Sequence, residues 1–234
     1  MGGMSEKELP FYRKDRISTG IRALDLMLEG GYKHPATIML TAPSGSEKQC
    51  FASHFVNRGM DQRDTIIYIT TDKEPKEVEK TAAGWGLHFK GPGQLYYINC
   101  YSKGKTTGMN NVYDVSGPGA LNEISLYISE ILRQNQEGRI RLVFHTFSTF
   151  ALYNQQDSLF KFLQSVEERV KRGNGTILLL VEEGMHEKKF MTTLRHSTDE
   201  EYLLESKGKM MDLTGKRLPI PIPLKVGSLG VEVE

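Results

Sequence analysis

The stretch TAPSGSEKQC, residues 41–50, is the first candidate for phosphate chemistry, because its lysine lies between an apolar run and a stretch typical of a helix. Loops that cradle phosphates follow the pattern G-x-x-x-x-G-K-[S/T] between a strand and a helix. Lys48 keeps the lysine of that pattern. Ala42 and Glu47 occupy its two glycine positions, and Gln49 replaces its hydroxyl. The residues expected to contact a phosphate-bearing cofactor, if one binds, are Pro43, Ser44, Gly45, Ser46, Glu47, Lys48, Gln49 and Cys50.

These replacements weaken the loop as a phosphate site. A side chain at Glu47 opposes the backbone conformation and the close phosphate approach that glycine permits. It adds strain of ~1–2 kcal/mol if the φ angle there is positive, and its carboxylate repels a polyphosphate. Gln49 lacks the hydroxyl that ligates Mg²⁺. For Lys48, which supplies only a point charge, three hypotheses stay open: it contacts an anion, it is a solvated lysine at a helix start, or it pairs with Glu47, which then fills the phosphate position.

Strand and helix signals alternate along the chain that must position this loop. Short apolar runs with β-branched or aromatic residues predict strands at residues 37–41, 65–70, 95–99, 140–146 and 176–182. Apolar residues at helical spacing predict helices at 120–134 and 158–171, the second ending in basic residues followed by glycine. Short buried strands separated by helices indicate an α/β fold, with a parallel sheet covered on both faces.

The tail, residues 201–234, differs from this pattern because glycines break it into short extended segments. Pro219, Pro221 and Pro223 cannot donate a regular ladder of hydrogen bonds, so that stretch is expected at a sheet edge or as a polyproline-like connector. Residues 101–119 form the longest predicted loop. We predict an N-terminal arm at residues 1–16 and one domain at residues 17–234. The core of this domain is expected at residues 17–200, and an antiparallel β extension at residues 201–234.

Composition narrows the class of protein. The 234 residues, 38% hydrophobic and 25% charged, suit one well-buried domain. The net charge of +1, with both signs interspersed, argues against a strongly basic nucleic-acid surface. No apolar stretch approaches the ~20 residues that span a bilayer, and the N-terminus lacks the apolar segment of a secretory signal. Cys50 and Cys100 form no C-x-x-C pair, which favours buried thiols in a reducing cytoplasm.

Ordered segments along most of the chain resemble one family. ISTGIRALD at residues 17–25, followed by LEGG at 28–31, is similar to a segment of the KaiC-like branch of the RecA-type P-loop ATPases. The order continues through the loop to IIYITTDKEPKEVEKTAAGWGL, LYYINCYS, LNEISLYISEIL, RLVFHTFSTFALYN and EEGMH. The chain looks most similar to single-domain archaeal KaiC-like proteins, over residues 17–230. The resemblance implies a RecA-like, mostly parallel sheet with helices on both faces and a C-terminal antiparallel β extension.

The departures from this family fall on its chemistry. The family's loop resembles GPPGTGKTT, so the loop here is a degenerate Walker motif. His145 stands where the family has the aspartate that holds the metal's coordination shell, and imidazole suits Mg²⁺ poorly. Of the family's paired glutamates, the first is here the shorter Asp72, and Lys73 reverses the charge of the second. A general base must reach the attacking water to within ~3 Å. The resemblance therefore implies that Asp72, Lys73 and His145 are vestigial catalytic positions, and it implies no metal site.

Residues at the ends of the last two predicted core strands have both a functional and a purely structural interpretation. One interpretation of His145 is a metal ligand that acts together with His186 or Glu182. The other is a hydrogen-bonded histidine at a strand end, and we favour it because no zinc-ligand spacing is present. Glu182 and Glu183 are read either as paired carboxylates or as part of a strand-end turn, and the turn is favoured because EEGMH matches a segment of the family.

Basic residues that could touch nucleic acid are scattered, without the interleaved aromatic residues of single-strand binders. Lys216 and Arg217 could also be the remnant of a finger that, in the family, reaches a neighbouring subunit's nucleotide. Exposed, solvated charge is the default interpretation. The basic residues concerned are Arg13, Lys14, Arg16, Lys103, Lys105, Lys207, Lys209, Lys216 and Arg217.

Three functions follow from these observations. The first is a KaiC-like pseudo-ATPase that regulates or scaffolds through contacts with itself or with active relatives, since RecA-type sites typically lie between subunits. The second is a weak ATP- or ADP-binding protein, or residual ATPase, that uses Lys48 without a well-held Mg²⁺. The third is a RecA-like protein associated with nucleic acid, against which the near-neutral charge counts.

Overall fold

The computed structural model describes residues 13–101, 106, 108–135, 138–208 and 210–234. Within them, ten strands form one sheet in the order β12-β11-β10-β9-β3-β8-β7-β4-β5-β6. Its parallel part, including the contact of β9 with β3, confirms the predicted α/β fold class. The strands of this part are β3 (Ala36–Ala42), β4 (Thr65–Thr70), β5 (Gln94–Asn99), β6 (Val112–Asp114), β7 (Ile140–His145), β8 (Gly175–Glu182) and β9 (Glu200–Lys207).

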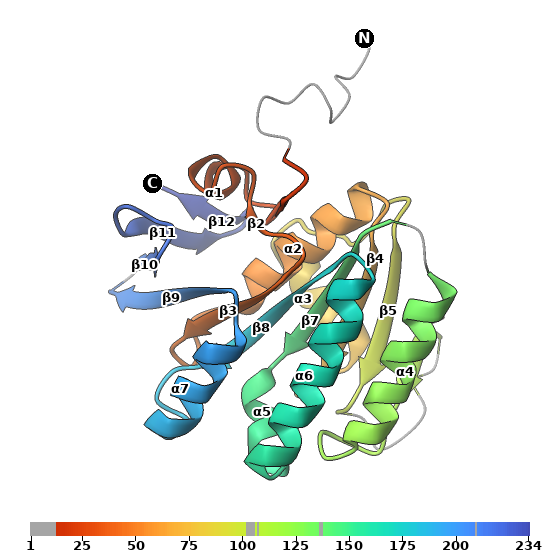
Figure 1. Cartoon of the computed structure of the whole chain (residues 1–234). Helices are drawn as coiled ribbons and strands as arrows, with labels where there is room; N and C mark the ends of the chain where they lie inside the picture. Colours follow the sequence, from red (N-terminus) through yellow and green to blue (C-terminus); the bar gives the residue numbers. More distant parts are fainter. Residues whose placement is uncertain (1–12, 102–105, 107, 136–137, 209) are drawn as a thin grey trace.

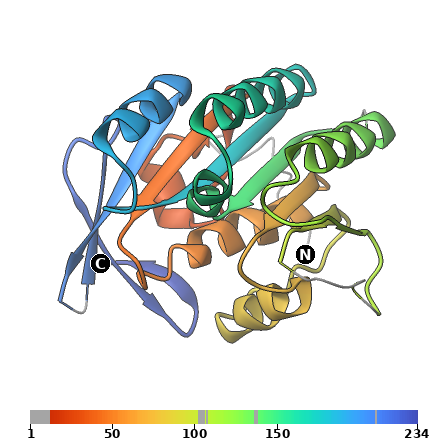
Figure 2. The same cartoon turned by 90° about the horizontal axis from the view of Figure 1, so that it is seen from below.

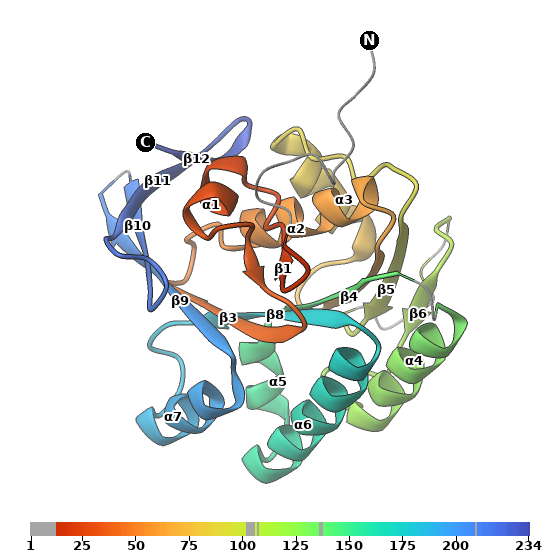
Figure 3. The same cartoon turned by 45° about the horizontal axis from the view of Figure 1, so that its top comes forward.

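Helices cover both faces of the sheet (Figures 1 and 3). One face carries α1 (Arg22–Met27), α2 (Gln49–Asp61) and α3 (Pro75–Gly84), together with a two-stranded ribbon of β1 (Arg16–Ile17) and β2 (Tyr32–Lys33). The other face carries α4 (Leu121–Gln134), α5 (Phe147–Tyr153), α6 (Gln156–Arg172) and α7 (Lys188–Ser197). No helix in the described residues is long and apolar enough to cross a membrane.

The two cores follow from the alternation of side chains along each strand. In β4, Ile66 and Tyr68 lie in the core beneath α2, whereas Ile67 and Ile69 lie in the core beneath α4 and α6. All six residues of this strand are buried, because helices cover both faces. An uninterrupted apolar run is therefore what a central parallel strand requires.

The predicted antiparallel β extension is confirmed. β9 joins the sheet by pairing parallel with β3, and β10 (Met210–Gly215), β11 (Ile222–Gly227) and β12 (Gly230–Val233) then follow by antiparallel pairing. Pro223 lies within β11, opposite Asp212 of β10, and Pro219 and Pro221 precede this strand. Figure 2 shows the blue C-terminal strands at one side of the molecule and the yellow-green segments at the other.

One prediction about the connections is wrong in part. Residues 101–119 are not loop throughout, because β6 lies within them and pairs with β5 as the edge strand of the sheet, Val112 opposite Tyr97. A strand of three residues, with no regular apolar pattern of its own, is stabilised by the hydrogen bonds of its neighbour. The division into an arm of residues 1–16 and one domain stays a prediction; residues 1–12 lie outside the described part, and Arg16 belongs to β1.

Candidate phosphate-loop site

The carboxyl ends of four parallel strands bring the expected site residues to one edge of the sheet. The loop with Lys48 follows β3, Asp72 and Lys73 follow β4, and His145 ends β7. β8 ends beside β3, and the pairing places Glu182 opposite Ala42. Ligands of open parallel sheets bind outside these strand ends, so the predicted positions form one site.

Lys48 is a buried cation with a carboxylate partner. Its Nζ lies 3.0 Å from Oε1 of Glu182, and the two side chains are only 8% and 26% exposed. Of the three hypotheses for Lys48, the pair with Glu47 is not the one found, because its Nζ contacts the carboxylate at the end of β8 instead. Glu182 is the site residue that sequence reasoning missed: it was assigned to a turn, although an acidic residue at the end of the last core strand was a signal.

The backbone at Glu47 has the conformation that glycine normally supplies. Its φ angle is +52°, in the left-handed region, so the strain of ~1–2 kcal/mol expected for a residue with a side chain applies here. Gly45, two residues earlier, has φ of +75°. The backbone at position 47 is therefore left-handed although the residue there is no longer glycine.

Other loop residues are unequal candidates for ligand contact. Cys50 is fully buried in the core beneath α2, and burial raises the pKa of its thiol to about 12. The thiol is therefore withdrawn from a ligand, and the expected contact of Cys50 with a cofactor stays a prediction. The hydroxyl of Ser46 is buried and makes no hydrogen bond to any described residue. The hydroxyl of Thr41, at the end of β3, is likewise buried without a partner among the described residues.

Gln49 and Lys73, two of the residues that replace the family's catalytic groups, contact each other. Lys73 Nζ donates a hydrogen bond to Oε1 of Gln49 at 3.0 Å. In the family pattern, the position of Gln49 carries the hydroxyl that ligates Mg²⁺. A cationic ammonium therefore lies beside the position where a metal ion would be held.

His145 is enclosed rather than free to bind a ligand. It is 3% exposed, its Nδ1 lies 2.9 Å from the Tyr68 hydroxyl, and burial lowers its pKa below the usual range. Burial raises the pKa of Tyr68, so that hydroxyl stays protonated and donates to the neutral imidazole. Asp72 Oδ1 lies 3.9 Å from the same Nδ1. The interpretation of His145 as a hydrogen-bonded strand-end histidine is confirmed.

The alternative metal site at His145 has no support among the described residues. No group of three or more His, Cys, Asp or Glu side chains there could hold a metal ion. His186 Nε2 lies 2.8 Å from the hydroxyl of Ser148, which also accepts from the backbone N–H of Glu182. Near the loop, the Lys73 ammonium and the neutral imidazole of His145 do not suit the oxygen shell of Mg²⁺, and the carboxylate of Glu182 is paired with Lys48.

The scattered basic residues have different surroundings. Lys103, Lys105 and Lys209 lie outside the described residues. Arg217 binds Glu200 at 3.1 Å and the backbone oxygen of Leu28 at 3.2 Å within its own chain, which does not support its interpretation as a finger. Lys207 pairs with Asp212, and Lys216 is exposed. Arg13, Lys14 and Arg16 gather around a cavity at the opposite edge of the sheet.

The family model described as "ATPase: KaiC" matches residues 17–203. A UPF0273 protein of Methanopyrus kandleri is 25% identical over 183 residues, which cover 75% of this chain and 70% of the relative. The circadian clock oscillator protein KaiC 1 of Synechocystis is 31% identical over 75 residues, 32% of this chain but only 14% of that much longer protein.

A solved structure shares the fold. The crystal structure of a KaiC-like protein from the hyperthermophilic archaeon Pyrococcus horikoshii OT3 superposes with a TM-score of 0.72, covering 94% of this chain and 98% of that one. The two sequences are 16% identical. The likeness confirms the expected RecA-like architecture of the single-domain archaeal type.

Proposed function

Because this chain belongs to the KaiC family of ATPases, we propose that it keeps the family's fold but has lost phosphoryl transfer, and that it acts as a regulatory or scaffolding protein through contacts with other proteins. Its partners in this proposal are further copies of itself or active KaiC-like relatives. Leu152 and Tyr153, on α5, are 60% and 65% exposed and leave apolar surface for such contacts.

The observation that carries the proposal is the ion pair of Lys48 with Glu182 at 3.0 Å. A phosphate group near Lys48 would have to displace the carboxylate of Glu182, and until it did so the two anions would repel each other. Both side chains are largely withdrawn from water, so the ammonium depends on this partner. The protein supplies its own anion where the family's loop holds a phosphate.

The other replacements support the same conclusion. Lys73 places a positive charge against Gln49, which disfavours a divalent cation there. Asp72 is 44% exposed and lies beside His145, at a position where the shorter side chain is not suited to orient a water. Metal, hydroxyl ligand and base are therefore all compromised, and no hydrolytic step can be derived for this site.

A second candidate function is weak, metal-independent nucleotide binding. The buried Ser46 hydroxyl without a described partner favours it, since a phosphate oxygen could accept its hydrogen bond. The 13-residue helix α2 begins directly after the loop and presents its N-terminus to any anion bound there. In this case a phosphate of the nucleotide would replace the carboxylate of Glu182 as the partner of Lys48.

Phosphate release from Mg-ATP and calorimetric titration with ATP and ADP test these functions together. We expect no turnover by the wild type. Turnover that Lys48→Ala removes, while Lys161→Ala, an exposed lysine of α6, leaves it intact, would overturn the pseudo-ATPase proposal. Nucleotide binding without turnover, lost in Lys48→Ala, would favour the second candidate.

Restoration is the complementary test. Because several groups have been lost together, turnover should return only when all of them are replaced, and recovery through one substitution alone would contradict the proposal. The combined substitutions are Ala42→Gly, Glu47→Gly, Gln49→Thr, Asp72→Glu, Lys73→Glu and His145→Asp.

A further inference from the structure

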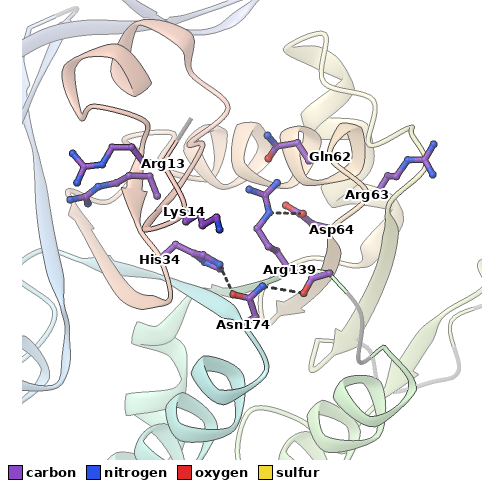
Figure 4. Close-up of a pocket in the computed structure, with 10 residues that line it drawn as sticks. Arg13, Lys14, His34, Gln62, Arg63, Asp64, Arg139 and Asn174 are labelled. Atoms are coloured by element: carbon purple, nitrogen blue, oxygen red, sulfur yellow. Dashed lines mark hydrogen bonds and ion pairs between the residues drawn. The ribbon is translucent and has the colours of Figure 1, made fainter. Parts of the chain in front are cut away.

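A cavity of about 500 Å³ lies at the amino ends of the parallel strands, the edge opposite the phosphate loop. Asp64, Arg139 and Asn174 each come directly before β4, β7 and β8, and His34 comes just before β3. These residues converge from four separate parts of the sequence (Figure 4). The cavity is therefore separate from the phosphate-loop site.

The side chains around this cavity are mostly cationic. Five of the lining residues carry positive charge, namely Arg13, Lys14, Arg16, Arg63 and Arg139, and the lining includes one carboxylate, Asp64. Charges of one sign in a concave site reinforce each other's potential, because the low-dielectric walls concentrate the field. A net charge of +1 for the whole chain hides this local excess.

Asp64 cannot neutralise the cations around it. It is 2% exposed; its Oδ1 accepts from Arg139 Nε at 3.0 Å and its Oδ2 from Arg141 Nε at 2.7 Å. Arg141 is fully buried and also donates to the backbone oxygens of Ser18 and Phe55. One carboxylate thus faces two guanidinium groups, and the terminal nitrogens of Arg139 form no hydrogen bond within the described residues.

Neighbouring carboxylates compensate only part of the remaining charge. Arg13 pairs with Asp15 and Glu29, and Arg16 pairs with Asp15 and Glu200. Lys14 and Arg63 are exposed and form no ion pair in the part of the chain that is described. These two side chains, with Arg139, are the cations available to a ligand.

The floor of the cavity is fixed by hydrogen bonds. His34, 5% exposed, lies with Nδ1 2.8 Å from the Thr176 hydroxyl and with Nε2 3.0 Å from the Asn174 side-chain oxygen. Asn174 in turn donates to the backbone oxygen of Gly138 at 3.3 Å. Figure 4 shows His34 and Asn174 directed towards each other, and Arg139 extending towards Asp64. The polar groups are held in place before any ligand binds, which lowers the entropic cost of binding.

The lining determines the class of ligand. The described lining residues include no Phe, Tyr or Trp and no aliphatic side chain, and the ring of His34 is hydrogen-bonded through both of its nitrogens, so charged and polar groups dominate the cavity. A guanidinium group can donate two parallel hydrogen bonds to two oxygens of a phosphate group. The volume of the cavity lies in the range of small-molecule sites. We propose that this cavity binds a short chain of phosphate groups, either as free polyphosphate or as the phosphate end of a nucleotide.

Calorimetric titration of the full chain with tripolyphosphate, without Mg²⁺ and at low salt, tests this proposal. We expect saturable binding that the double variant Lys14→Gln/Arg63→Gln weakens by about tenfold or more, because two charge-assisted contacts are lost. The matched control, Lys161→Gln/Lys188→Gln, removes two cations from α6 and α7 and should bind as the wild type does. Lys48→Ala should also bind normally, which separates this cavity from the phosphate loop and from the function proposed for it.

Several results would overturn the proposal: no saturable binding at millimolar tripolyphosphate, equal weakening in both double variants, loss of binding in Lys48→Ala, or binding of single-stranded RNA without binding of tripolyphosphate. Titration of ATP into Lys48→Ala identifies the source of the phosphate chain. Equal affinity for ATP and tripolyphosphate supports recognition of the phosphates alone, and tighter binding of ATP supports a nucleotide.

Discussion

The ammonium of Lys48 lies 3.0 Å from the carboxylate of Glu182, across the carboxyl ends of β3 and β8. The lysine is the most recognisable remnant of the phosphate loop, and its partner comes from a strand that begins more than a hundred residues later in the chain. In the function proposed here, Glu182 supplies the anion at the position where the family's loop holds a phosphate. Stability and ligand binding at this edge should therefore depend on the same contact.

Glu182→Gln should lower the free energy of unfolding by about 1–3 kcal/mol, because Lys48 is left largely buried without a carboxylate. The same variant should bind ATP more tightly than the wild type in the absence of Mg²⁺, since the competing anion is gone. Urea denaturation and calorimetry measure the two effects. Glu183→Gln, the exposed neighbour, should change neither; a Glu182→Gln protein as stable as the wild type would show that the pair contributes nothing.

Glu47→Gly should raise the free energy of unfolding by about 0.5–1 kcal/mol, because relief of the left-handed backbone exceeds the entropy that glycine loses on folding. The φ angle of +52° at Glu47 is the basis of this expectation. Glu77→Gly, in the first turn of α3, should have the opposite sign and destabilise by a similar amount. If both substitutions destabilise the protein in urea denaturation, the backbone strain at Glu47 is smaller than the entropy that glycine loses on folding.

His54 should make the protein lose stability in weak acid. Its Nε2 accepts a hydrogen bond from the backbone N–H of Val231 at 2.9 Å, tying β12 to α2, and burial lowers its pKa to about 4. The unfolded chain, with a pKa near 6.5, then binds more protons than the folded chain between these values. The contribution is present above about pH 6.5 and is lost as the pH falls towards 4, by up to ~3 kcal/mol.

His54→Gln keeps a neutral acceptor and should flatten this part of the profile, measured as the free energy of unfolding at several pH values. Burial also lowers the pKa of His145, so some slope should persist in the variant. His88→Gln, which removes a histidine from the surface, should retain the wild-type slope. An unchanged slope in His54→Gln would assign the acid sensitivity to other groups.

The sequence by itself determined the central strands, the sheet type and the replacements in the loop. Central strands such as Thr65–Thr70 are buried on both faces, so their apolar runs are visible without any knowledge of their neighbours. The positions of Lys48, Gln49 and His145 are also visible in the sequence, because each residue belongs to a motif of consecutive residues. The short strand β6 was missed, because its pairing with β5 rather than its own composition stabilises it.

Contacts between residues distant in the sequence were decided by the tertiary structure alone. The strand order places Glu182 opposite Ala42 and within reach of Lys48, whereas adjacency in the sequence suggested Glu47. The fold also gathers Lys14, Arg63 and Arg139 around one cavity, although these cations are scattered along the chain. Side-chain charge is a property of the sequence, but electrostatic potential depends on distance, and only the packed parallel sheet sets those distances.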